Sequence, residues 1–212
     1  MNSIYHTTNI VPFLDFVIGI ILLSGVFYIG KKIVYFLKLE IIFKNISDLN
    51  YQYILIGTNF LIIILLPIII FLNTGSLIIL TAATYLIFIS GFLQIYNFFQ
   101  SINVHKINRV SPFEILIIIS IFLYFLISSS PVTNADSLDY HLQLAKNILQ
   151  NKMLINIPSH MHSNLFGGGE SLIAIGLIGG SEQLNSMIQF SGLISILGLL
   201  KKKNNTSKNL II

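Results

Sequence analysis

The sequence contains no cysteine and no tryptophan, and it is poor in charged residues. Without cysteine, the chain has neither a disulfide bond nor a thiolate metal site. Charged residues make up 9% of the 212 residues, whereas a soluble domain carries about 25%. Hydrophobic residues make up 54%. A soluble fold of this length could not hide so much apolar surface, so we expect an integral membrane protein.

Five apolar segments are candidate transmembrane helices, since a helix of about 20 apolar residues crosses the hydrocarbon core. Four of them are long, at residues 10–29, 53–72, 76–96 and 113–130, and a fifth at 184–200 is shorter and more polar. Each must be helical, because backbone polar groups in lipid have no water to bind. The sequence therefore predicts an all-α polytopic protein with about five spans.

The basic residues predict the orientation of these spans, because cytoplasmic loops are enriched in Lys and Arg. With the N-terminus outside, all Lys and Arg residues except Lys146 and Lys152 fall on the inner side. We expect a multi-pass protein of a bacterial plasma (inner) membrane. Its parts are a three-span region at 1–112, a region at 113–200 with an outer loop at 131–183, and a basic polar tail at 201–212, expected to be unstructured.

The outer loop contains two short helical patterns. Leu138, Leu142, Ala145 and Leu149 recur at helical spacing, which predicts an amphipathic helix along the membrane surface. The apolar stretch 171–178 is too short to cross a bilayer. We expect it to form a re-entrant or interfacial helix.

Asp136 is the first candidate for chemistry, because it follows the fourth span at the start of the predicted surface helix. It is suited to act as a general base or a metal-binding carboxylate at the membrane edge. The structural alternative is a helix N-cap, since Asp136 followed by Asp139 resembles a capping box. Both roles are compatible, because a cap also fixes a carboxylate in space.

Three histidines lie in the same loop. His141, next to Tyr140, is suited to protonate or hold a phosphate group, and the alternative is an aromatic pair at the membrane interface. His160 and His162 are spaced to share a metal ion in an extended loop. No further ligand set is evident, which favours a solvated loop.

A glycine run and one intramembrane acid complete the candidates. Residues 167–169 are all glycine and precede Glu170, so they could form an anion-binding nest at a helix start, or a hinge. Glu170 would then complement the helix dipole. Asp15 lies inside the first span, where a carboxylate is a functional candidate unless it reaches the interface.

The stretch 130–146 resembles the first outer loop of the GT-C superfamily of membrane glycosyltransferases. In a bacterial branch, a span ends in a Pro-rich turn, and an Asp then precedes a Tyr-His pair and a surface helix with a Lys. Asp136, Tyr140, His141 and Lys146 match this pattern. A second block, 163–166 with Glu170 and the glycines at 179–180, is similar to the segment that follows. The resemblance covers residues 113–200. It departs at Asn134, where an additional acid is common, and at Asp139, which has no counterpart.

The resemblance implies sugar transfer from a polyprenyl-phosphate donor to a glycan, lipid or protein acceptor outside the cytoplasm. It implies that Asp136 is the catalytic base. It also implies that Tyr140, His141, Lys146 and Glu170 bind substrate. No resident cofactor is implied, a divalent cation stays open, and nucleic acid is not an expected partner.

Two other classes compete with the enzyme. A transporter or channel subunit would need polar residues facing one another inside the membrane, and the second to fourth spans are nearly all Ile, Leu and Phe. A non-catalytic membrane protein is the other alternative. We also expect the chain to be the N-terminal part of a longer enzyme, or to work with a subunit that supplies further spans, and to be inactive alone.

Overall fold

The computed structural model describes residues 12–39, 52–71, 76–101, 112–130, 141–152 and 167–208, and no strand occurs in these ranges. The helices are α1 (Pro12–Phe36), α3 (Tyr53–Phe71), α4 (Ser76–Ser101), α5 (Pro112–Ser128), α6 (Leu142–Asn151), α7 (Gly168–Gly179) and α8 (Leu184–Lys208). The predicted all-α class is confirmed for this part of the chain.

Three helices are long and apolar enough to cross a membrane, namely Phe13–Phe36, Tyr53–Phe71 and Leu77–Ser101. Shorter apolar helices cover Ile115–Ser128, Gly168–Gly179 and Leu184–Gly198. Large apolar side chains are exposed on α3, α4 and α5, as expected where lipid is the solvent. Length, composition and exposure thus support a membrane protein with three candidate spans.

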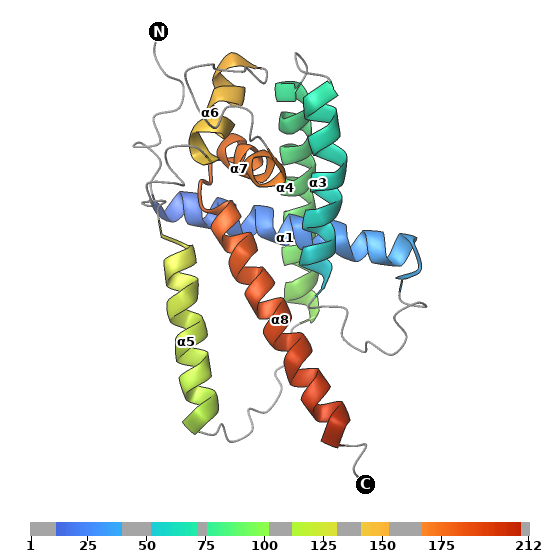
Figure 1. Ribbon diagram of the computed structural model, residues 1–212, viewed down its shortest axis with the longest axis vertical. Helices are drawn as coiled ribbons and strands as arrows, with labels where there is room; N and C mark the ends of the chain where they lie inside the picture. Colours follow the sequence, from blue (N-terminus) through green and yellow to red (C-terminus); the bar gives the residue numbers. More distant parts are fainter. Residues whose placement is uncertain are drawn as a thin grey trace.

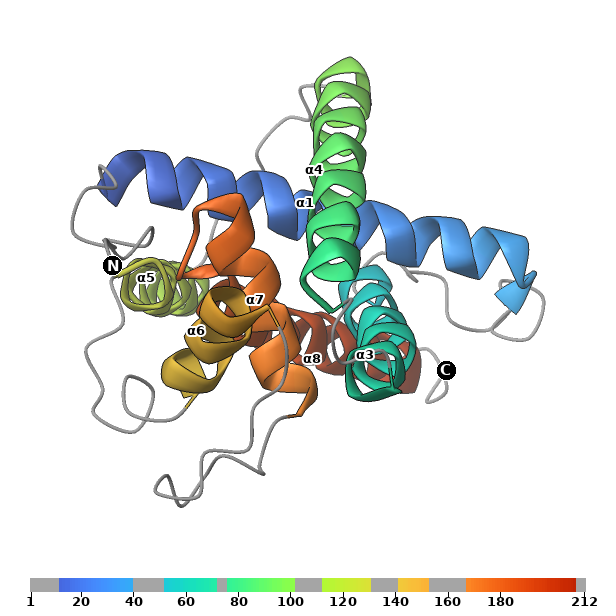
Figure 2. The ribbon, with the colours of Figure 1, turned by 90° about the horizontal axis from the view of Figure 1, so that it is seen from above.

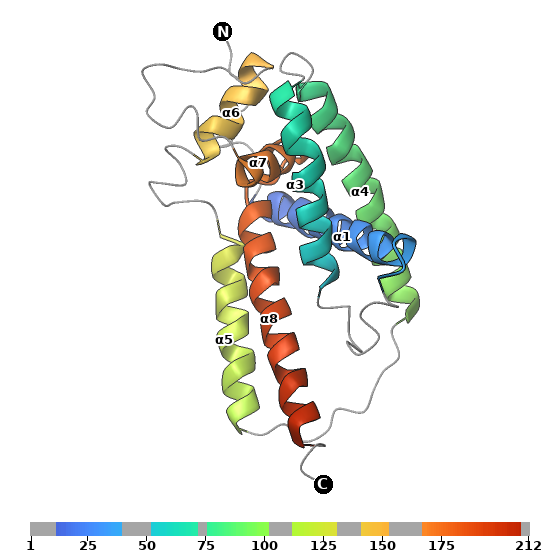
Figure 3. The ribbon, with the colours of Figure 1, turned by 45° about the vertical axis from the view of Figure 1, so that its right-hand side comes forward.

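Helix α1 lies across α3 and α4 instead of running alongside them (Figures 1 and 3). Helices α5 and α8 run side by side in the same views and contact each other. Hydropathy identifies which segments are apolar but says nothing about the direction of their axes. The transverse α1 therefore differs from the set of parallel spans that hydropathy alone suggests.

Glycines at the crossing points allow α1 to approach its neighbours closely. A Cβ atom on Gly25 of α1 would lie 2.0 Å from the carbonyl oxygen of Ile87 on α4, and one on Gly91 of α4 would lie 2.0 Å from that of Ile21. Real Cβ atoms essentially never come this close. The backbones can touch only because neither position carries a side chain.

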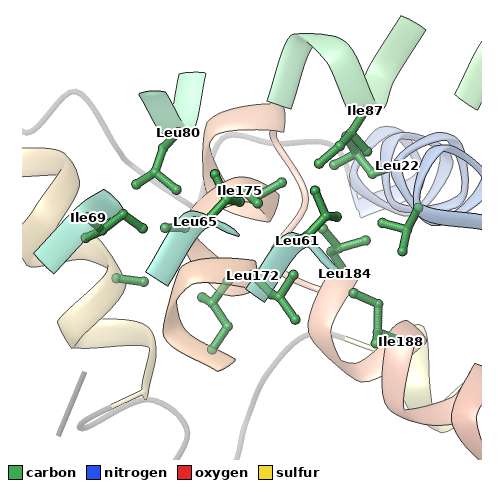
Figure 4. Packing of buried hydrophobic residues seen from close by; sticks show 14 of the residues in the cluster. Leu22, Leu61, Leu65, Ile69, Leu80, Ile87, Leu172, Ile175, Leu184 and Ile188 are labelled. Carbon is green, nitrogen blue, oxygen red and sulfur yellow. The ribbon is translucent and has the colours of Figure 1, made fainter. Parts of the chain in front are cut away.

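Helix α7 lies at the centre of the described core (Figure 4). It contacts α1, α3, α4, α6 and α8, and its residues from Glu170 to Gly176 are buried. The core cluster around it includes Leu22, Leu61, Ile87, Leu172, Ile175 and Leu184. The helix expected to be interfacial or re-entrant is therefore surrounded by protein, and its apolar side chains are buried against other helices.

Helix α6 packs over α7, as the view from above shows (Figure 2). The predicted apolar positions Leu142, Ala145 and Leu149 are all buried, together with Leu144 and Ile148. The amphipathic pattern is thus confirmed at these three positions, whereas Leu138 lies outside the described residues, and the apolar face packs on the protein and not along a membrane surface.

Helix α8 continues to Lys208, so the prediction of an unstructured tail from residue 201 is wrong up to that residue. Lysine has a good helix propensity, and extending an existing helix avoids the cost of a new nucleus. The apolar first half of α8 supplies that nucleus.

Candidate functional site

The starts of α6 and α7 are joined by a contact between His141 and Glu170. The imidazole Nδ1 of His141 lies 2.5 Å from the carboxylate Oε1 of Glu170, across 29 residues of sequence. His141 directly precedes α6, and Glu170 lies in the first turn of α7. Two residues predicted separately as substrate-binding candidates are therefore neighbours.

The two side chains differ in exposure. The Glu170 side chain is 6% exposed, whereas that of His141 is 39% exposed. A second bond holds the carboxylate, because its Oε2 accepts the backbone N–H of Gly167 at 2.8 Å. A buried carboxylate thus fixes one edge of a half-exposed imidazole, an arrangement that orients a histidine for proton transfer or anion binding.

The same bond changes the interpretation of the glycine run. The N–H of Gly167 binds the chain's own Glu170 carboxylate, so this group is not free to bind a ligand anion. Gly168 and Gly169 belong to α7 itself. The expected anion nest is therefore wrong for the Gly167 N–H, the hinge stays a prediction, and Glu170 supplies the negative charge that a helix N-terminus favours.

Most of the other predicted site residues cannot be placed relative to this pair. Asp136, Asp139, Tyr140, His160 and His162 lie outside the residues that the structure describes. His141 stands at the described start of α6 and makes no side-chain cap bond, and the two roles predicted for Asp136, general base and N-cap, stay predictions. Lys146 is half-buried on α6. Within the described ranges it does not form an ion pair.

A second polar cluster was missed in part by sequence reasoning. Asp15 is buried beside the turn between α7 and α8, near Ser181 and the backbone of Glu182. The sequence predicts Asp15 as a functional candidate, because it is a carboxylate inside an apolar segment. Ser181 and Gln183 carried no such signal, although both are buried. No group of three or more His, Asp or Glu side chains that could hold a metal occurs in the part of the chain described.

These features define a helical protein with candidate membrane spans and a carboxylate–histidine pair at one end of its core. The chain belongs to the family described as the DUF1420 N-terminal domain, whose model matches residues 89–211, more than half of the sequence. The match contains both His141 and Glu170, and it begins inside α4. No curated protein and no solved structure matches the chain.

Proposed function

We propose that the chain is a membrane glycosyltransferase, or a part of one, that transfers a sugar from a polyprenyl-phosphate donor to an acceptor on the outer side of the membrane. The region that resembles GT-C enzymes, 113–200, lies inside the family match at 89–211. The family description carries no activity, so the proposal rests on the resemblance and on the site.

One observation carries the proposal. The resemblance consists of two blocks, one with Asp136, Tyr140, His141 and Lys146, and one with Glu170. The 2.5 Å contact between His141 and Glu170 brings the two blocks to one place. If the loop forms a single active site, the two blocks must be in contact. The resemblance by itself did not predict this contact.

The chemistry can be assigned to residues. Asp136 accepts the proton of the acceptor hydroxyl while that oxygen bonds to the anomeric carbon. The bond from this carbon to the donor phosphate breaks through an oxocarbenium-like transition state. The polyprenyl phosphate leaves as an anion, which needs positive or dipolar partners. His141, held by Glu170, is the first of these, and Lys146 and Tyr140 are the others.

The proposal includes a topology and partners. The N-terminus lies outside, five spans cross a bacterial plasma membrane, and the loop 131–183 faces outward, where a lipid-anchored donor can reach it. A divalent cation can assist the leaving phosphate. A further polypeptide segment or subunit that supplies additional spans would complete the donor groove.

The test measures sugar transfer in membranes of the source cells after the gene is deleted and then restored. Transfer from labelled polyprenyl-phosphate sugars should be lost on deletion and recovered with the natural sequence. Glu170→Gln should lower the recovered rate by roughly tenfold or more, because it removes the charge that orients His141. Gln143→Ala is the matched control, since it removes only the bond from Gln143 to Asn147 on α6. Unchanged transfer after deletion would refute the proposal and leave a non-catalytic or transport role.

A further inference from the structure

A buried polar cluster lies where the N-terminal half of α1 meets the turn between α7 and α8. Asp15 is 7% exposed, and Ser181 and Gln183 are each 1% exposed. The Asp15 carboxylate lies near the Ser181 hydroxyl and the backbone N–H of Glu182. Gly19, one turn after Asp15, packs directly on this turn, because a Cβ there would lie 2.7 Å from Ser181 Oγ.

Oxygen atoms of the cluster lack partners. Asp15 Oδ1, Ser181 Oγ and Gln183 Oε1 are buried, and within the described residues none of them makes a hydrogen bond of ordinary distance and angle, although the Ser181 hydroxyl and the Glu182 N–H lie beside the Asp15 carboxylate. Leaving one buried polar atom unpartnered is costly, and such atoms are rare in folded proteins. Three such atoms, one on α1 and two in the facing turn, are oxygens of the kind that coordinate a cation.

Among the described residues, no basic side chain forms an ion pair with Asp15. The His141–Glu170 ion pair lies elsewhere in the core and does not involve Asp15. Asp15 instead lies beside the N-terminal end of α8, whose dipole offsets part of one negative charge. A bound cation would balance the negative charge of Asp15, and the unpartnered oxygens would coordinate it.

The backbone beside Asp15 joins the end of α7 to the start of α8 through a short turn. Helix α7 ends at Gly179, Gly180 has a positive φ of 90°, and α8 begins at Leu184. The N–H groups of Gly180 and Ser181 bond back to Leu177 and Gly176 and so close the end of α7. Two helix ends therefore meet at a buried carboxylate, as at ion sites of transporters with interrupted helices, but here the Gly176 and Leu177 carbonyls are already bonded, so side-chain oxygens would supply the ligands.

The ligand types restrict the choice of ion. The donors are one carboxylate, one hydroxyl and one amide oxygen, with no His or Cys, which disfavours Zn²⁺ and other transition metals. A single carboxylate is a weak match for Ca²⁺, which takes 6–8 oxygen ligands, often from several carboxylates. We propose that Asp15, Ser181 and Gln183 form a binding site for a small monovalent cation, with Na⁺ as its ligand.

The experiment uses the full chain in lipid nanodiscs, prepared in choline chloride without sodium. The unfolding temperature is measured while NaCl replaces choline chloride at constant ionic strength, and retention of radioactive Na⁺ is measured in parallel. A saturable rise in the unfolding temperature and saturable Na⁺ retention are expected, because a ligand that binds only the folded state stabilises it. Asp15→Asn should abolish both effects, and Ser181→Ala should weaken Na⁺ affinity roughly tenfold or more.

Two further variants keep the test decisive. Gln94→Leu removes another buried, unpartnered side-chain oxygen that lies in α4, outside the cluster, so it should leave the Na⁺ response unchanged. Gly19→Ala places a Cβ against Ser181 without altering charge and should block Na⁺ retention even if Asp15→Asn fails to fold. If the natural chain retains no Na⁺ and its unfolding temperature does not change with Na⁺ concentration, the proposal is wrong and the cluster holds water or a proton. Sugar transfer is measured separately, so either proposal can fail without the other.

Discussion

His141 and Glu170 are in contact through Nδ1 and Oε1 at 2.5 Å, although one precedes α6 and the other belongs to α7. Glu170 also bonds the N–H of Gly167, so a single carboxylate both caps α7 and holds the start of α6. The pair therefore serves stability as well as the proposed chemistry, and the two roles can be separated by substitution.

Glu170→Ala should destabilise the protein by about 2–4 kcal/mol, because it removes two hydrogen bonds of a buried carboxylate and a helix cap. Glu170→Gln should cost less, since its amide oxygen can still accept the N–H of Gly167. Denaturant unfolding in detergent micelles, followed by circular dichroism, measures both. Equal stability of Glu170→Ala and the natural protein would show that the contact contributes nothing.

Asp136→Asn should abolish sugar transfer while the protein still accumulates in the membrane. Asparagine keeps the size and can still cap a helix, but it cannot accept a proton at neutral pH. Asp139→Asn is the matched control and should be milder, because the resemblance gives Asp139 no role. The measurement is the transfer rate per amount of protein in membranes. Near-normal transfer by Asp136→Asn would remove it as the base.

Single cysteines can test the topology, since the natural sequence contains none. Reagents that cannot cross the membrane should label positions 5 and 150 in intact cells, and position 45 only after the cells are opened. Positions 5 and 45 lie on either side of α1. Equal labelling of both in intact cells would show that the transverse α1 does not cross the membrane.

Gly25→Ala should destabilise the protein by about 1–3 kcal/mol, because the new Cβ would overlap the backbone of α4 and force the helices apart. A Cβ on Gly25 meets the Ile87 carbonyl oxygen at 2.0 Å, whereas one on Gly169 meets nothing within 4 Å. Gly169→Ala is therefore the control, and it should be neutral or slightly stabilising. Thermal unfolding in nanodiscs compares them, and similar midpoints for the two variants would contradict the close packing.

The family match and the resemblance both leave out the two N-terminal helices. The family model begins at residue 89, inside α4, so α1 and α3 precede it. Yet α1 contacts α3, α4, α7 and α8. The N-terminal helices are therefore packed against the matched region and support the position of α7, which carries Glu170.

The sequence by itself determined the helical class and the apolar segments. Their excess of Ile, Leu and Phe leaves lipid as the natural solvent, and backbone groups in lipid must form helices. The periodicity of Leu142, Ala145 and Leu149 likewise identified the buried face of α6. These properties are local, because each depends on residues within a few turns of one another.

Only the tertiary structure decided the direction of α1, the meeting of His141 with Glu170, and the placement of Ser181 beside Asp15. Each joins residues far apart in sequence, and no hydropathy or spacing pattern records which distant surfaces pack together. Gly25 and Gly91 illustrate the reason. Each was unremarkable as a single glycine, and their importance appears only when two helix backbones meet without intervening side chains.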